Sequence, residues 1–340
     1  MSALTHDVGD GYYRIRLESP SQLVVNAWLL KSGGRAVLFD TGFTHSTDQL
    51  IAGLRDLNVE LKDLEAVVYT HTHNDHLGGG VALNDELQCP NILWSGTHPR
   101  LYTDFYEVNT AIPHTAEWLA GYLPATPENR ERLQEMASIP EGKLRCGGDG
   151  SLDRRRFVEI DDEIELAGRR FRCIDARGHD PYHVAWLDLD TGTMVSGDVI
   201  LRVPTPLMPH MHDDLPMWLD TLHRWETTLE VKRLLPGHGM GTSMFLQAIE
   251  RSRLVIQRLY EATQRCVEDG LPVDPVTIVE EYSGQDRSRY AQRFAIATST
   301  LINLLLELQK LGYLHALDGG YWVEVRTLPP WDELQPWPRR

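Results

Sequence analysis

The stretch THTHNDH, residues 70–76, constrains the fold of this chain more than any other part of its sequence. It follows a short apolar run that is typical of a buried strand, and it contains His71, His73, Asp75 and His76. Imidazole nitrogen and carboxylate oxygen are common ligands of zinc, iron and manganese. His71 and His73 stand two apart in an extended loop, so their rings can point the same way, and Asp75 and His76 are expected in the following turn. The motif therefore predicts part of a metal site whose other ligands lie elsewhere.

The segments around this motif alternate between strands and helices. Apolar runs of strand length occupy residues 23–30, 36–39 and 66–69, and a helical pattern covers residues 46–57. Further strand-like runs between residues 157 and 195 are joined by glycine turns, which predicts a second, largely antiparallel sheet. Because α/β folds place functional side chains where strands end, the sequence predicts an α/β fold with its site at the strand ends.

Three residues far along the chain can supply the missing ligands. His179 stands in "ARGHD", Asp198 in "VSGDV" and His238 in "LPGHG". Each of them follows an apolar stretch and comes directly after a glycine, which allows the backbone to turn sharply beside a crowded ion. A site that holds two metal ions about 3.5–4 Å apart needs a third nitrogen, a bridging carboxylate and a further nitrogen. These three residues match that requirement.

In this pattern the chain resembles the metallo-β-lactamase fold superfamily, whose H-x-H-x-D-H motif stands here at residues 71–76. The resemblance covers residues 20–240 and implies a four-layer αββα sandwich that holds two divalent metal ions, expected to be zinc, with iron or manganese as alternatives. The ligands that it implies are His71, His73 and His179 for the first metal, Asp75, His76 and His238 for the second, and Asp198 as a bridge between both. Asp40 in "LFDTG" also matches the family, and its implied role is to accept a hydrogen bond from a ligand histidine. The alternative for Asp40 is a turn-capping aspartate.

The chain is predicted to divide into a catalytic domain at residues 1–244 and a C-terminal helical region at residues 245–340. A polar, helix-prone insertion interrupts the catalytic domain at about residues 97–145. Tyr102, Tyr106, His114 and Trp118 are scattered through it. We expect this insertion either to shape a pocket near the site or to cover an edge of a sheet.

The C-terminal region follows the outline of a winged helix. Helical patterns at residues 245–269 and 275–281, and a longer one that ends at Gly312, precede a hairpin that turns at residues 318–320. Between residues 276 and 326 there are six acidic and five basic residues, so no basic face for nucleic acid is expected. We therefore expect the region to serve packing or dimerisation, and its shape resembles the appendage of one branch of the superfamily.

The composition disfavours several classes of partner. Lys and Arg number 33 against 49 Asp and Glu, and the net charge of −16 disfavours binding to nucleic acid and to anionic membranes. The N-terminus lacks the pattern of a secretory signal and no run approaches about 20 apolar residues, so a cytoplasmic protein is expected. The four cysteines lie far apart, so neither a disulfide framework nor a thiolate metal site is expected.

Two divalent ions lower the pKa of a water that bridges them, so the expected reaction is hydrolysis by a metal-bridging hydroxide that attacks a carbonyl. The expected substrate is a small or carrier-bound thioester or ester. A lactonase, a β-lactamase-like hydrolase, a metal-dependent nuclease and a diiron oxidative enzyme are the alternatives. Asp75 is expected at the catalytic centre, and Tyr182 and His183 either donate to the developing oxyanion or pack beside a strand. A homo-oligomer is compatible with the sequence.

Overall fold

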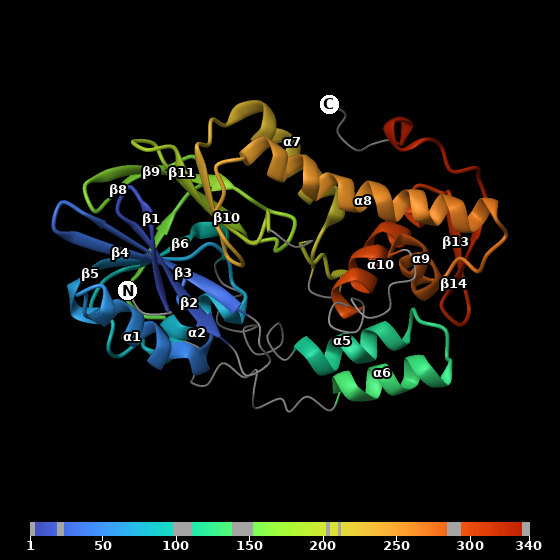
Figure 1. The fold of residues 1–340 in the computed structure, drawn as a ribbon, viewed down its shortest axis with the longest axis horizontal. Coiled ribbons are helices and arrows are strands. Elements are labelled where there is room, and N and C mark those ends of the chain that lie inside the picture. The colour runs from blue at the N-terminus through green and yellow to red at the C-terminus, as the bar shows by residue number, and fades with distance from the viewer. Residues whose placement is uncertain are drawn as a thin grey trace.

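The computed structural model describes residues 4–18, 24–97, 111–137, 152–201, 205–209, 212–283 and 294–334. Figure 1 shows two lobes, one that gathers the strands of two sheets and one that gathers the C-terminal helices. Within the described ranges, no helix is long and apolar enough to cross a membrane. The three cysteines that are described are all free and buried.

The first sheet has seven strands among the described residues, and their order across the sheet follows their order in the chain. The strands are β1 (Thr5–Gly9), β2 (Tyr12–Glu18), β3 (Val24–Ser32), β4 (Arg35–Phe39), β5 (Leu64–Val68), β6 (Asn91–Trp94) and β7 (Arg155–Val158). Neighbouring strands are antiparallel from β1 to β4 and parallel from β4 to β7. The carboxyl ends of β4 and β5 therefore lie at the same edge of the sheet.

The second sheet has the order β12-β11-β10-β9-β8. Its strands are β8 (Glu163–Leu166), β9 (Arg169–Asp175), β10 (Val184–Asp188), β11 (Thr193–Gly197) and β12 (Arg233–Pro236). The pairs are antiparallel except for β11 and β12, which run parallel and so end at one edge. The prediction of a second, largely antiparallel sheet is confirmed.

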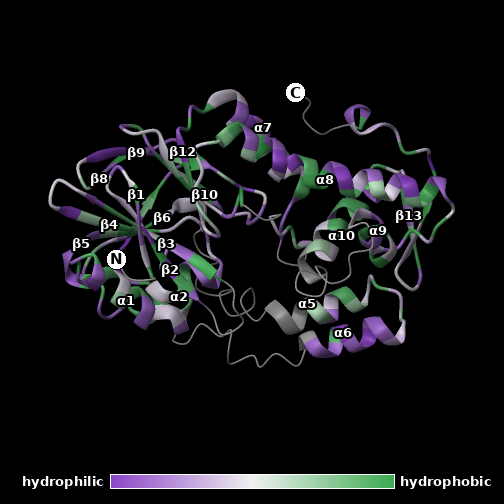
Figure 2. Ribbon diagram, viewed as in Figure 1, coloured by the Kyte–Doolittle hydropathy of each residue, from purple (hydrophilic) through white to green (hydrophobic). Residues whose placement is uncertain are grey.

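The two sheets face each other, and helices cover their outer faces. Because successive side chains of a strand point to opposite faces, Val25 and Leu29 of β3 pack toward helices α1 (Thr47–Asp56) and α2 (Asn74–Ala82), while Trp28 packs toward the second sheet. On the far side, the second sheet packs against α7 (Leu215–Thr228) through a separate cluster. Figure 2 shows hydrophobic residues in the strands of the two sheets and also in helices such as α10 (Phe294–Lys310). The predicted four-layer αββα sandwich is confirmed.

The first turn of α2 corrects the sequence analysis, which places Asp75 and His76 in a turn. The glycine run at residues 78–80 is a poor helix former and conceals the helix in the sequence. In the structure this run allows close packing, because a Cβ on Gly79 would lie 2.3 Å from the backbone oxygen of Thr41. The contact brings the start of α2 against the chain that leaves β4.

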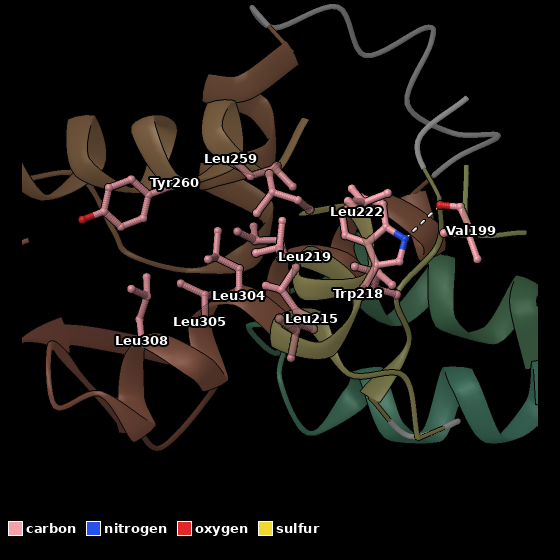
Figure 3. Packing of buried hydrophobic residues seen from close by; sticks show 14 of the residues in the cluster. Val199, Leu215, Trp218, Leu219, Leu222, Leu259, Tyr260, Leu304, Leu305 and Leu308 are labelled. Carbon is pink, nitrogen blue, oxygen red and sulfur yellow. Dashed lines mark hydrogen bonds between the residues drawn. The ribbon is translucent and has the colours of Figure 1, made fainter. Parts of the chain in front are cut away.

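The C-terminal region contains the predicted helices and hairpin. They are α8 (Phe245–Glu268), α9 (Pro275–Ser283), α10 (Phe294–Lys310), β13 (Leu314–Leu317) and β14 (Tyr321–Glu324). One hydrophobic cluster runs from the second sheet through α7 and α8 to α10 (Figure 3). In this cluster, Leu219 of α7 lies near Leu259 of α8 and Leu304 of α10. The core therefore continues across residue 244, and the division of the chain at that residue stays a prediction.

The described helices of the insertion lie beside the C-terminal region. They are α5 (Ala111–Ala120) and α6 (Pro127–Ala137), and Figure 1 shows them beside the C-terminal helices. The ring of Trp118 lies 4.8 Å from that of Tyr122, which stacks at 6.2 Å on Trp322 of β14. The described helices thus cover the C-terminal region at its β13-β14 hairpin, and a role of the insertion in shaping a pocket near the site stays a prediction. The predicted aromatic residues Tyr102 and Tyr106 and the side chain of His114 lie outside what the structure describes.

Candidate metal centre

The predicted ligands lie where strands of both sheets end. Asp40 follows β4, and His71 and His73 follow β5. Asp198 follows β11 and His238 follows β12 in the second sheet. Because both of these strand pairs are parallel, each sheet delivers its polar residues to a single edge, and the two edges meet.

The structure brings all seven predicted ligand side chains together in two groups, and the potential ligand atoms within each group lie within 4.8 Å of one another. The first group consists of His71, His73 and His179, and the second of Asp75, His76, Asp198 and His238. Oδ2 of Asp198 also lies 3.8 Å from Nε2 of His179, so this carboxylate reaches toward both groups. Both groups are therefore able to hold metal ions.

In the first group, hydrogen bonds fix which ring nitrogen faces the centre. Nδ1 of His179 lies 2.8 Å from the carbonyl oxygen of Pro206, so this nitrogen carries the proton and Nε2 presents a lone pair. That Nε2 lies 3.1 Å from Nδ1 of His73. Nδ1 of His71 lies 3.0 Å from the hydroxyl of Thr70, which leaves Nε2 of His71 for a ligand. The three nitrogens converge.

The second group combines two carboxylates with two imidazoles. Nε2 of His238 lies 3.1 Å from Oδ2 of Asp75 and 3.1 Å from Oδ2 of Asp198. Nε2 of His76 lies 3.4 Å from Oδ1 of Asp198. The opposite nitrogen of His238, Nδ1, lies 2.5 Å from the carbonyl oxygen of Val24, so Nε2 is the nitrogen that faces the two carboxylates.

Asp40 holds the loop and one histidine from below. It is 1% exposed, and its Oδ2 lies 2.8 Å from Nδ1 of His76, which is the predicted hydrogen bond from a ligand histidine. The backbone N–H of Thr70 donates to Oδ1 at 2.9 Å, and the Thr70 hydroxyl donates to Oδ2 at 2.8 Å. Asp40 therefore orients His76 directly and His71 through Thr70.

A chain of contacts from the C-terminal region supports the loop that carries Pro206. The backbone N–H of Leu207 donates to the hydroxyl of Thr300 at 3.1 Å, and the amide of Asn303 donates to the carbonyl of Asp213 at 3.2 Å. Both donors and acceptors are buried. Helix α10 thus holds the segment whose carbonyl orients the last histidine of the first group.

Three buried polar atoms test whether these residues fit a metal ion. Nε2 of His71, Nε2 of His76 and Oδ1 of Asp198 have no hydrogen-bond partner among the described residues. Leaving a buried polar group unpaired costs about 1–3 kcal/mol, and more for a charged group. All three atoms belong to the two ligand groups, and a divalent ion would satisfy them. The donor set therefore fits metal binding.

The two groups have different charges in the absence of metal. Burial, together with neighbouring histidines, lowers the pKa of His71 well below its ordinary value. Burial and the nearby His73 lower the pKa of His179 to about 4. In the second group burial would raise the pKa of Asp75, but His76 and His238 outweigh it and lower that pKa to about 2. His71 and His179 are thus neutral, and Asp75 is ionised.

His238 shows the opposite shift to His179. Burial acts to lower the pKa of His238, but Asp198 and Asp75 outweigh burial and raise it to about 10. The same carboxylates outweigh burial at His76 and raise its pKa well above the ordinary value. Burial is thus similar at both groups, and the carboxylates decide the direction of the shift. Without metal, the second group holds protons on its histidines at neutral pH.

Two glycines before the ligands are required by the geometry. The φ of Gly197 is +49°, and a Cβ there would lie 2.6 Å from Nε2 of His183. A Cβ on Gly237 would lie 2.1 Å from Oδ1 of Asp198 and 2.5 Å from Cε1 of His76. These contacts explain in physical terms why glycine precedes Asp198 and His238.

His183 and Tyr182 take different positions. His183 is 0% exposed, its ring stacks on that of His71 at 4.4 Å, and its Nε2 accepts a hydrogen bond from the backbone N–H of Asp198 at 3.0 Å. These contacts hold the ring of His71 and the backbone at Asp198, and the role of His183 as an oxyanion donor stays a prediction. Tyr182 is half-buried, and its backbone N–H donates to Asp180 at 2.5 Å. Its role as an oxyanion donor stays a prediction.

The sequence analysis does not identify Asp180 or Thr70 as parts of the site. Oδ2 of Asp180 accepts from the hydroxyl of Thr72 at 2.9 Å and lies 3.8 Å from Nε2 of His73. Both residues stand next to a ligand in the chain, Asp180 after His179 and Thr70 before His71. A polar residue beside a ligand is therefore the signal that would have indicated them.

Comparison with known proteins agrees with this geometry. Residues 20–238 match the sequence model of the metallo-beta-lactamase superfamily. A beta-lactamase-like protein 2 homolog from Caenorhabditis elegans is 24% identical over 248 residues, which cover 70% of this chain and 66% of that protein. The Drosophila melanogaster homolog is 28% identical over 222 residues, or 63% of this chain and 58% of that protein. The matches thus span less than two thirds of the length of these relatives.

Solved structures resemble the chain over nearly its whole length. A metallo-beta-lactamase family protein from Thermus thermophilus has a TM-score of 0.70 at 19% identity, covering 94% of this chain and 100% of that one. A beta-lactamase domain protein from Burkholderia ambifaria has a TM-score of 0.66 at 21% identity, covering 96% and 97%. At these identities the likeness shows the fold alone. With the match over residues 20–238, the chain belongs to the metallo-beta-lactamase superfamily, whose members are generally metal-dependent hydrolases.

Proposed function

We propose that this protein is a dinuclear metal-dependent hydrolase that cleaves a carboxylic thioester or ester. The observation that carries the proposal is the convergence of ring nitrogens and carboxylate oxygens into two adjacent groups, three of whose atoms are buried without a partner among the described residues. A nitrogen and oxygen donor set suits zinc, with iron or manganese as alternatives. When bound, such ions activate water and polarise a carbonyl oxygen.

The residues of the chain have separate tasks in this proposal. His71, His73 and His179 would hold the first ion, and the second group would hold the other. Asp198 would contact both ions, because its carboxylate reaches toward His179 as well as His238. The pKa of Asp75, lowered to about 2, keeps this carboxylate ionised over the physiological range. Asp40 would hold the ring of His76 in the tautomer that ligation requires.

Tyr182 is proposed as a hydrogen-bond donor to the oxyanion that develops when the carbonyl is attacked. It lies three residues after His179 in the chain, and the contact of its backbone with Asp180 holds the turn that carries it. A donor aimed at a developing oxyanion contributes about 10²–10³ in rate. The net charge of −16 supports a small organic substrate over nucleic acid, whose phosphates it would repel.

The experiment is a hydrolysis screen of the purified, metal-loaded protein with esters, thioesters, lactones and phosphodiesters. We expect carbonyl substrates to be cleaved, and His71→Ala and Asp198→Ala to abolish the activity. His315→Ala, which removes an exposed imidazole from β13, is the matched control and is expected to retain full activity. A protein that holds metal yet cleaves only phosphodiesters would support the nuclease alternative instead. Metal-dependent oxygen consumption without hydrolysis would support the diiron alternative.

A further inference from the structure

A cavity of about 440 Å³ lies between the second sheet and helix α8. Ile200 and Met240, which are part of its lining, each stand two residues after a ligand, Asp198 or His238. The volume falls within the range of about 300–1,000 Å³ that is typical of small-molecule sites. The cavity therefore has the size of a small-molecule site, and its lining includes residues that follow the ligands Asp198 and His238 closely in the chain.

Apolar side chains form part of the floor and of the rim of this cavity, together with the polar Thr242 and Ser252. Ile200 and Leu234 are each 1% exposed and form part of the floor. At the rim, Met240 is 40% exposed and Met244 is 50% exposed, which is a large exposure for an apolar side chain. Methionine is flexible and polarisable, and it adapts to ligands of varied shape. The walls thus suit an alkyl or acyl chain.

Helix α8 adds positive charge to this apolar cavity. Arg251 and Arg258 both line it, together with Val255. These residues stand at positions i, i+4 and i+7, so they share one face of the helix. Both arginines are exposed, and a pair of guanidinium groups along an apolar wall is the arrangement expected for binding an oxyanion.

The other two arginines of α8 show that these charges are not simply neutralised on the surface. Arg253 pairs with Glu226 at 2.5 Å, and Arg265 pairs with Glu281 at 2.7 Å. Neither Arg251 nor Arg258 forms an ion pair with a carboxylate in the described ranges, although acidic residues outnumber basic ones by 49 to 33 in the chain. The two arginines that line the cavity are thus the two on this helix without a carboxylate partner in the described ranges, and Nε of Arg251 donates to the carbonyl oxygen of Gln247 at 3.2 Å.

We propose that this cavity binds the part of the substrate that leads away from the scissile carbonyl, and that this part is an apolar chain ending in an oxyanion. The chain would lie against the methionines and the aliphatic floor, and its terminal carboxylate or phosphate would bind Arg251 and Arg258. This inference rests on the proposed hydrolase function and specifies its substrate class as an anionic, partly apolar ester or thioester.

The test compares two esters that differ only at the far end, para-nitrophenyl hexanoate and the mono-para-nitrophenyl ester of adipic acid. We expect the wild type to prefer the adipate ester, and Arg251→Gln with Arg258→Gln to lower the ratio of the two kcat/KM values by about tenfold. The lysine variants, which keep the charge, should restore much of the preference. Arg265→Gln removes one charge from the same helix outside the cavity and should leave the ratio unchanged. An unchanged ratio in the double glutamine variant, with metal content intact, would overturn the inference.

Binding measurements separate this inference from the proposed function. If the wild type cleaves neither ester nor the corresponding thioesters, the hydrolase proposal fails, and the cavity is tested by calorimetric titration with adipate and with hexyl phosphate. Loss of binding of either anion in the double glutamine variant still supports the site and shows which oxyanion it selects. Equal binding by the wild type and the double variant contradicts the site, whatever the enzyme cleaves.

Discussion

The first ligand group offers three imidazoles to a metal ion, whereas the second offers two imidazoles and two carboxylates. Both groups are almost fully enclosed, yet the pKa of His179 falls to about 4 and that of His238 rises to about 10. The carboxylates account for the difference, because they stabilise a proton on the neighbouring imidazole. The first group is therefore ready for a metal ion at neutral pH, while the second must release protons to accept one.

The largest effect on both groups is expected from a change at Asp198, whose carboxylate lies near histidines of both. Asp198→Asn keeps the shape of the side chain but removes the charge that faces His76, His238 and His179. Loss of a residue that only hydrogen-bonds a ligand typically lowers activity by about 10–100-fold, and we expect a larger fall here. We also expect the second group to lose its metal ion before the first. Metal analysis and the ester assay measure this. Asp220→Asn, at an exposed helix position, is the control and should change neither.

A change of pH should alter the metal affinity of the second group but not that of the first. A metal ion must displace the protons of His238, whose pKa is about 10, and of His76, whose pKa is also raised, so as the pH is lowered the affinity of the second group should fall about tenfold per pH unit for each proton displaced. Between pH 8 and pH 6 this amounts to about a hundredfold for each of the two protons. His179, with a pKa of about 4, is neutral over this range, and the first group should keep its metal. Chelator competition at several pH values measures both affinities; parallel loss of both metals would contradict the comparison.

A change at Asp40 should affect the two groups differently, because one hydrogen bond joins it to His76 of the second group and two hydrogen bonds, through Thr70, join it to His71 of the first group. An asparagine there has a single acceptor oxygen, whereas Asp40 accepts three hydrogen bonds from Thr70 and His76. We expect Asp40→Asn to weaken the second group by about 10–100-fold and the first group less, because His71 is reached only through Thr70. Stepwise metal titration followed by calorimetry measures this. Equal weakening of both groups would remove the distinction.

The smallest effect is expected from the helix that supports the first group. Thr300→Val removes the acceptor of the buried Leu207 N–H, which costs about 1–3 kcal/mol of unfolding free energy. Through Pro206 and His179 the first group should lose less than about tenfold in affinity, and the second group nothing. Denaturant unfolding and metal titration check both numbers. Thr227→Val serves as the control, because the hydrogen bond that the Thr227 hydroxyl donates to the carbonyl oxygen of His223 is exposed.

Much of the sandwich can be predicted from the sequence, because strands buried on both faces read as apolar runs and the site residues follow them. The helix α2 cannot, because three glycines hide its periodicity, and the reason for them is a close backbone contact with Thr41 that only the fold reveals. Helix α7 is also missing from the predicted elements, although Asp214 caps it and a proline stands in its first turn. These last signals are local and are available in the sequence.

The partners of the ligands are harder to predict than the ligands themselves. Asp40 is identified by its place in a motif, but Pro206 offers only a backbone carbonyl, which no side-chain pattern reports. For His183, proximity in the chain does not tell whether the ring faces the substrate or packs behind a ligand, and the structure shows it in contact with His71 and with the backbone of Asp198. Orientation depends on the packing of β10 against β11, and that requires the folded structure.

The continuous cluster that joins the second sheet, α7, α8 and α10 has a consequence for how the molecule unfolds. Segments that share one core cannot lose their packing independently, because each would expose apolar surface of the other. We expect heat or denaturant to melt the sandwich and the C-terminal helices in a single cooperative transition, despite the two lobes visible in Figure 1. On this expectation the two lobes behave as one folding unit, and a metal ion bound in the sandwich should raise the melting temperature of both together.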